Sequence, residues 1–239
     1  MKKTLRILQL YPRDMNIYGD WGNVLVLKQR AQWHGYGVEL LEYNQGDVFP
    51  ENIDMIVGGG GQDAGQSKIK HDLPAIKDIV TRQAEDGMPM LVICGLYQLF
   101  GKFFETRGGE RIDGLGIFDI ETYGKTERLI GNVVLESSEF GQILGYENHS
   151  GQTFLSPAVS PLATVKKGVG NNQTDSSEGA RVHNVIGSYL HGSLLPKNPH
   201  IADWLIETAA IKKYGEFTPH VIDDRFADEA RAHASARPR

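Results

Sequence analysis

The sequence predicts an α/β fold in which helices cover both faces of a mostly parallel central sheet, with β-hairpins added in the C-terminal half. Two patterns predict it. Up to Gly109, short apolar segments alternate with segments of helical spacing, as in a parallel sheet that is buried on both faces. Beyond Gly109, short strand-like segments dominate, and these are typical of hairpins rather than of further helical crossovers.

The elements before Gly109 follow from the spacing of apolar residues. Strands are expected at residues 4–11, 38–43, 53–57 and 89–93. Helices are expected at residues 23–34, 71–85 and 96–104. Two of the strands end in unusual turns. Four glycines occupy positions 58–61, and Cys94 and Gly95 come directly after the fully apolar strand at 89–93.

The chain beyond Gly109 carries short strand signals and one helix. The strand-like segments are residues 116–123, 128–136, 141–148 and 162–168, and the helix is expected at 199–213. Residues 168–181 are rich in Gly, Asn and Ser and are expected to form an exposed loop. We interpret residues 1–225 as a single domain. Residues 226–239 lack a usable apolar face, so a flexible tail is expected there.

The composition excludes several classes of function. The net charge of -5 leaves no basic surface for a phosphate backbone, so nucleic acid is not an expected partner. No apolar run reaches the roughly 18 residues of a transmembrane helix, so direct insertion into a membrane is not expected. The N-terminal apolar stretch is interrupted by Arg6 and ends at Pro12, which is too short for an export signal. We therefore expect a cytoplasmic protein.

Cys94 is the one cysteine of the chain, which excludes an internal disulfide and a multi-cysteine zinc site. No metal site is expected. A lone cysteine in the cytosol is either a small core residue or a nucleophile. Cys94 lies between an apolar strand and a glycine followed by a helix, which places it at the carboxyl end of a parallel sheet, where open α/β folds bind ligands. A helix N-terminus there favours the thiolate and offers N–H groups to an oxyanion, so the pattern favours a nucleophile.

Five motifs resemble those of one protein family. Residues 93–101 (ICGLYQLFG) resemble the nucleophile turn of class I, triad-type glutamine amidotransferases of the cobyric acid synthase-like branch, and residues 188–192 (SYLHG) resemble its histidine motif. The other three are residues 15–23 (MNIYGDWGN), 58–63 (GGGGQD) and 145–151 (GYENHSG). They narrow the resemblance to the amidotransferase subunits of lipid II isoglutaminyl synthases. The resemblance covers nearly the whole chain.

The resemblance implies that Cys94 attacks the side-chain amide of glutamine and that His191 is the general base. His191 follows an apolar strand, and the motif singles it out over His183 and His149. The alternative for each residue is a structural role, as a small core residue for Cys94 and as a structural histidine for His191.

The third member of the triad is left open. In many class I relatives an acidic residue lies two positions after the histidine, where this chain has Ser193. A carboxylate from elsewhere in the chain could orient the imidazole, and Asp20 and Glu147 are the candidates. Each could equally be a structural carboxylate that caps a loop.

Gly60, Gly61 and Gly95 are expected to supply the N–H groups of an oxyanion hole, because glycine permits close backbone approach. A glycine-rich loop after a strand can also hold phosphate. GGGGQD, however, lacks the Lys-Ser/Thr of a P-loop and the spacing of a dinucleotide fingerprint. Leu96 stands where the family usually has a second glycine, and a bulkier residue there could tighten the oxyanion pocket.

Two further residues are expected to bind the substrate. The resemblance implies that Arg128 pairs with the α-carboxylate of L-glutamine, since a planar guanidinium group binds a carboxylate through two hydrogen bonds. The alternative is a surface arginine on a strand. Gln98 lies one helical turn after Cys94 and either faces the substrate or caps the helix.

The resemblance implies a subunit that hydrolyses L-glutamine and passes ammonia to a Mur ligase-like subunit (MurT) in a heterodimer. That partner would use ATP and Mg²⁺ to amidate the D-glutamate α-carboxyl of lipid II to D-isoglutamine, so this chain would reach lipid II only through its partner. No cofactor is expected on this chain, which has no ATP-binding signature. Two alternatives remain, an amidotransferase for cobyrinate-type amidation and a catalytically inert interaction subunit.

Overall fold

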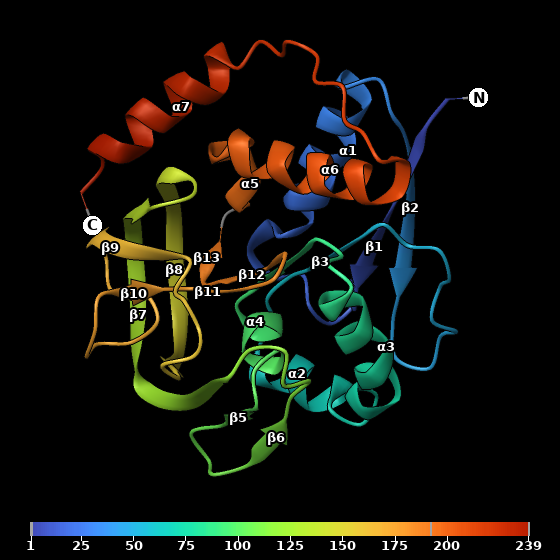
Figure 1. The fold of residues 1–239 in the computed structure, drawn as a ribbon. Helices are drawn as coiled ribbons and strands as arrows, with labels where there is room; N and C mark the ends of the chain where they lie inside the picture. The colour runs from blue at the N-terminus through green and yellow to red at the C-terminus, as the bar shows by residue number, and fades with distance from the viewer. Residues whose placement is uncertain (1, 192, 239) are drawn as a thin grey trace.

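The computed structural model describes residues 2–191 and 193–238, which form two sheets with surrounding helices (Figure 1). The first sheet contains β1 (Thr4–Leu10), β2 (Gly37–Tyr43), β3 (Met55–Gly58), β4 (Met90–Ile93), β11 (Ala180–Val182) and β12 (Val185–Ser188). Its order is β11-β12-β4-β3-β1-β2, and every neighbouring pair is parallel except β11 with β12. The predicted, mostly parallel sheet is confirmed.

Helices lie on both sides of this sheet. The helices of the described chain are η1 (Ile17–Gly19, a 3-10 turn), α1 (Trp21–Trp33), α2 (Asp63–Ile69), α3 (Leu73–Glu85), α4 (Gly95–Leu99), α5 (Leu194–Lys197), α6 (Pro199–Tyr214) and α7 (Arg225–Ala236), of which α7 lies beside α5 and β8 of the second sheet. Figure 1 shows α1 and α6 on one side and α3 on the other. Every residue of β3, β4 and β12 is buried, as the apolar sequences of these strands require. None of the helices in the described part of the chain has the length and apolarity to cross a membrane.

The second sheet contains the hairpins that were expected beyond Gly109. Its strands are β5 (Phe103–Glu105), β6 (Arg111–Asp113), β7 (Ile120–Ser137), β8 (Gly141–Leu155), β9 (Ala163–Lys167), β10 (Ser177–Glu178) and β13 (Leu190–His191). The long strands β7 and β8 pair as an antiparallel hairpin, and the register shifts between Gly124 and Leu129. Strand β13 pairs with β8, which joins the hairpin to the segment that carries His191.

The helix expected at residues 96–104 is much shorter in the structure. Helix α4 ends at Leu99, and strand β5 begins at Phe103. A Cβ on Gly101 would lie 2.6 Å from Ile120 Cγ1, so the chain turns tightly against β7 at this glycine. Packing against the second sheet therefore overrides the helical spacing of this segment.

Most of helix α7 lies within residues 226–239, where a flexible tail is expected from the sequence. None of the residues of α7 is buried, and its apolar positions are mainly alanines. Polar contacts hold it against the fold instead. Arg231 donates hydrogen bonds to the Lys197 carbonyl, to Asn198 Oδ1 at 2.9 Å and to the Gln142 carbonyl at 2.9 Å.

The register of the first sheet brings four chain segments to one edge. Leu10 is level with Gly58, Gly58 with Val92, and Ser188 with Ile93, so these strands end side by side. The segments that leave this edge are residues 11–20, the glycines at 59–61, Cys94 with α4, and the chain that leads to His191. Motifs that are far apart in the sequence therefore meet where an open α/β sheet binds its ligands.

Candidate active site

Cys94 lies in a strained turn between β4 and α4. Its backbone has φ 50° and ψ -104°, a sparsely populated conformation that costs on the order of 1–3 kcal/mol in a residue with a side chain. Two hydrogen bonds hold the turn. The Cys94 N–H donates to the Ser188 carbonyl at 2.8 Å, and the Gln98 N–H donates to the Cys94 carbonyl at 2.9 Å. The structure thus stores strain at the one residue that the sequence singles out as a nucleophile.

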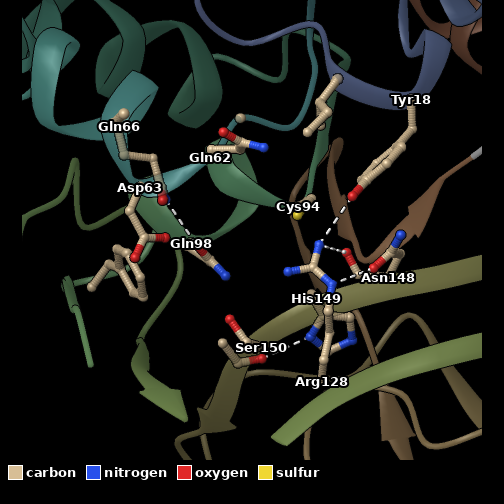
Figure 2. A pocket seen from close by; sticks show the side chains of 15 residues that line it. Tyr18, Gln62, Asp63, Gln66, Cys94, Gln98, Arg128, Asn148, His149 and Ser150 are labelled. Atoms are coloured by element: carbon tan, nitrogen blue, oxygen red, sulfur yellow. Dashed lines mark hydrogen bonds between the residues drawn. The ribbon is translucent and has the colours of Figure 1, made fainter. Parts of the chain in front are cut away.

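A cavity of about 330 Å³ opens beside Cys94 (Figure 2). Its volume lies within the roughly 300–1,000 Å³ that is typical of small-molecule sites. The labelled side chains around it are mainly polar and come from five segments of the chain. Those labelled in Figure 2 are Tyr18, Gln62, Asp63, Gln66, Cys94, Gln98, Arg128, Asn148, His149 and Ser150.

His191 and Cys94 are neighbours in the structure. A Cβ built on Gly60 would lie 2.7 Å from His191 Cε1 and 3.0 Å from Cys94 Cβ, so both side chains border the same point. His191 is almost fully buried, and its Nε2 has no hydrogen-bond partner in the described part of the chain. The structure therefore brings the predicted nucleophile and base together, and His191 Nε2 is left for proton transfer.

Asp20 holds the other ring nitrogen of His191. Its Oδ1 lies 3.3 Å from His191 Nδ1, and its side chain is only 2% exposed. Burial lowers the pKa of the imidazole, but the negative charge of Cys94 and the contact with Asp20 outweigh this effect and raise the pKa from 6.5 to about 10. Asp20 thus orients the imidazole and favours its protonated form, which leaves His191 placed to exchange a proton beside Cys94.

Glu147, the other candidate for the third position, has a different set of contacts. It is fully buried on β8, and its carboxylate accepts hydrogen bonds from the Val169 N–H at 3.0 Å and the Gly170 N–H at 2.8 Å. These bonds fix the loop that follows β9. Of the two carboxylates, Asp20 is the one that hydrogen-bonds His191.

The geometry corrects the expectation for Gly60. Its N–H donates to Asp20 Oδ2 at 2.7 Å and is therefore not available to an oxyanion. Gly61 and Gly95 lie next to each other, with the Gly61 nitrogen 2.9 Å from the point that a Cβ on Gly95 would occupy, and their role as oxyanion donors stays a prediction. Leu96 is fully buried, and a Cβ on Gly58 would lie 2.3 Å from its Cδ1, so it packs over β3 and does not tighten an oxyanion pocket.

Arg128 projects into the cavity from the irregular part of the β7–β8 hairpin (Figure 2). A shift of register re-aims side chains, which accounts for an arginine of an exposed strand that points into a site. Its Nε donates to Asn148 Oδ1 at 2.6 Å, and its Nη2 donates to the Tyr18 hydroxyl at 3.0 Å. The guanidinium group is therefore held in place from two sides.

Gln98 lies below Cys94 and is nearly buried, at 4% exposed. Its Oε1 accepts a hydrogen bond from Gln66 Nε2 at 2.7 Å, and its Nε2 donates to the Tyr189 hydroxyl at 3.1 Å. Gln66 also donates to the Gly95 carbonyl at 3.2 Å, so the pair braces the turn after the cysteine. Gln98 lines the cavity, as predicted, but as one member of a buried network.

Sequence reasoning missed three residues of the site, Tyr18, Asn148 and Gln66. Tyr18 and Asn148 belong to the motifs at 15–23 and 145–151, which the sequence singles out without indicating a role for either residue. Gln66 belongs to α2, an element that the sequence did not predict. Among the described residues, no group of three or more His, Cys, Asp or Glu side chains is arranged to hold a metal ion.

Several known proteins are similar to this chain in sequence or fold. Residues 6–199 match the CobB/CobQ-like glutamine amidotransferase domain. The chain is 41% identical to the GatD subunit of lipid II isoglutaminyl synthase (glutamine-hydrolyzing) from Staphylococcus aureus, over 95% of this chain and 93% of that protein. It is also 41% identical to the GatD subunit from Streptococcus pneumoniae, over 89% of this chain and 83% of that protein.

A solved structure supports the fold. A glutamine amidotransferase from Thermotoga maritima covers 96% of this chain and 93% of its own, with a TM-score of 0.54 at 14% identity. At that identity the likeness concerns the fold alone. The matched domain and the two GatD relatives show that the chain belongs to the CobB/CobQ-like glutamine amidotransferase family.

Proposed function

We propose that this chain hydrolyses the side-chain amide of L-glutamine to glutamate and ammonia, with Cys94 as nucleophile, His191 as acid and base, and Asp20 as the third member of the triad. The proposal rests on two buried contacts beside the cavity. Asp20 hydrogen-bonds His191 Nδ1, and His191 lies next to Cys94. Family membership supports the same reaction.

The reaction proceeds through a thioester. The Cys94 thiolate attacks the amide carbon, and the N–H groups of Gly61 and Gly95 stabilise the negative oxygen of the tetrahedral intermediate. Protonated His191 gives its proton to the leaving nitrogen, which departs as ammonia and leaves a γ-glutamyl thioester. His191 then takes a proton from water, whose oxygen attacks the thioester. Glutamate leaves and the thiolate is restored.

Arg128 binds the α-carboxylate of glutamine in this proposal. The cavity supports this role because Arg128 lines the same wall as Cys94 and is the arginine of that lining. A guanidinium fork matches a carboxylate and sets the distance from the α-carbon to the reacting amide. Gln98 supports the floor of the cavity beside it.

The ammonia is delivered to a second protein in this proposal. Two relatives at 41% identity carry names that identify them as glutamine-hydrolysing subunits of lipid II isoglutaminyl synthase. We infer a cytoplasmic heterodimer in which a Mur ligase-like subunit (MurT) holds ATP and Mg²⁺ and amidates the D-glutamate α-carboxyl of lipid II to D-isoglutamine. This chain carries no cofactor of its own and contacts lipid II only through the partner.

Glutamate release from L-glutamine tests the proposal. The chain is assayed alone and with a co-expressed Mur ligase-like subunit, as wild type and as Cys94→Ser, and the complex is then given lipid II and ATP. We expect release that is lost in Cys94→Ser and amidated lipid II as the product. Absence of cysteine-dependent release in both settings would overturn the hydrolysis. Release without amidation of lipid II would overturn the acceptor and leave the hydrolysis standing.

A further inference from the structure

Tyr18 lies between Arg128, the proposed carboxylate-binding residue, and His191, the proposed acid and base. Its hydroxyl accepts a hydrogen bond from Arg128 Nη2 at 3.0 Å. Its ring meets the His191 imidazole edge to face, with centroids 5.0 Å apart and planes at 75°. Figure 2 shows the phenol above the guanidinium group, at the same wall of the cavity as Cys94. Tyr18 thus connects the carboxylate-binding arginine to the catalytic pair.

The backbone around Tyr18 is firmly placed. Tyr18 has φ 57°, in the left-handed region that is costly for a residue with a side chain. Its neighbours are tied to the glycine loop. The Ile17 N–H donates to the Gly60 carbonyl at 2.9 Å, and Asp20 accepts the Gly60 N–H at 2.7 Å. A strained residue held from both sides is consistent with a side chain whose position matters to the site.

The hydrogen bonds of Arg128 define what else can bind beside it. Nε donates to Asn148 Oδ1 at 2.6 Å, and Nη2 donates to the Tyr18 oxygen at 3.0 Å and to the Asn148 carbonyl at 3.5 Å. Nη1 is left to bind a carboxylate, and a carboxylate bound there lies near the phenol. The phenol oxygen accepts from Arg128, so its own hydrogen is directed elsewhere and can be donated to that carboxylate.

We propose that Tyr18 is a second binding group for the α-carboxylate of glutamine, donating its hydroxyl hydrogen to the oxygen that Arg128 also contacts. This proposal rests on the proposed function, because it assumes that Arg128 binds that carboxylate. It makes Tyr18 a specificity-determining residue, since a ligand with a neutral group at this position loses a charge-assisted hydrogen bond.

Tyr18→Phe is the sharpest test, because it removes the hydroxyl and keeps the ring against His191. Binding of L-glutamine is measured by calorimetry on the complex with the Mur ligase-like subunit, in a Cys94→Ala background that blocks turnover. Loss of a hydrogen bond to a charged group predicts a Kd that is roughly 10- to 100-fold higher. The α-amide of L-glutamine, with a neutral carboxamide in place of the carboxylate, is expected to show a much smaller change.

Tyr123→Phe is the matched control, because that hydroxyl hydrogen-bonds Glu121 at 2.9 Å, outside the cavity lining. Its Kd is expected to equal that of the parent. An unchanged Kd in Tyr18→Phe together with a raised Kd in Arg128→Ala would overturn the role of Tyr18 alone. An unchanged Kd in both variants would overturn the role proposed for Arg128 as well. Equal weakening of glutamine and its α-amide would also overturn the proposal, since the carboxylate would not be the group recognised.

Discussion

Asp20→Asn keeps the size of the side chain and removes the charge that faces His191. The two side chains are 2% and 1% exposed, so water does not replace the lost contact between Oδ1 and Nδ1. A hydrogen bond to a charged group contributes about 1.5–3 kcal/mol. Since about 1.4 kcal/mol corresponds to a factor of ten in rate, we expect kcat for glutamine hydrolysis to fall roughly 10- to 100-fold. KM is expected to change little, because Asp20 acts through His191.

The pH profile separates a catalytic role of Asp20 from a structural one. The pKa of His191 is raised to about 10, so the charged imidazole persists through neutral pH and is lost as the pH rises through that value. The stabilisation that comes with this shift is complete below pH 6.5 and disappears over the same range. Asp20 contributes to the shift, so Asp20→Asn should move the alkaline fall in activity to lower pH.

Initial rates of glutamate release from the complex, measured from neutral to alkaline pH, check both expectations. Circular dichroism of the same samples shows whether the variant is folded. Wild-type kcat with an unmoved alkaline limb in Asp20→Asn would refute the reasoning and return the third position to Glu147 or to no residue.

Three other substitutions probe the remaining contacts. Glu147→Gln keeps one acceptor oxygen and places an amide N–H against one of the two backbone donors, so we expect the free energy of unfolding to fall by about 1–3 kcal/mol with little change in kcat; a loss of kcat without a loss of stability would contradict this. Gly60→Ala puts a Cβ 2.7 Å from His191 Cε1 and 3.0 Å from Cys94 Cβ, and kcat should fall on the order of 100-fold in a glutaminase assay. Arg231→Ala should speed hydrogen exchange in α7 without altering glutamine hydrolysis, and unchanged exchange would show that other contacts hold the helix.

Much of the site could be predicted from the sequence because parallel strands end at one edge. The apolar strand before Cys94 and the glycine run after β3 are local signals, and the fold makes them neighbours. His191 required the family motif, since an apolar strand before a histidine is too weak a signal to choose it among eight histidines. The choice between Asp20 and Glu147 could not be made, because it depends on the path of the loop after β1 and on which carboxylate other groups already occupy.

The sequence-based predictions that were wrong or missing also have physical causes. Gly60 was assigned to the oxyanion hole because composition cannot show that its N–H is taken by Asp20. Helix α7 was not predicted because most of the apolar residues at its helical spacing are alanines, a weak signal, and none of its residues is buried. The helix expected at residues 96–104 was cut short by packing at Gly101, a contact with a strand almost twenty positions later in the chain.

One short loop after β1 carries both the carboxylate that orients the general base and the phenol that touches the substrate-anchoring arginine. The turnover rate and the substrate preference therefore both depend on the position of this loop. In a directed-evolution experiment, a library confined to residues 15–20 would change both properties at once. Variants selected for a new γ-carboxamide substrate should show a lower turnover rate. Recovering that rate should require further changes in the glycine loop at residues 59–61, which hydrogen-bonds the same segment.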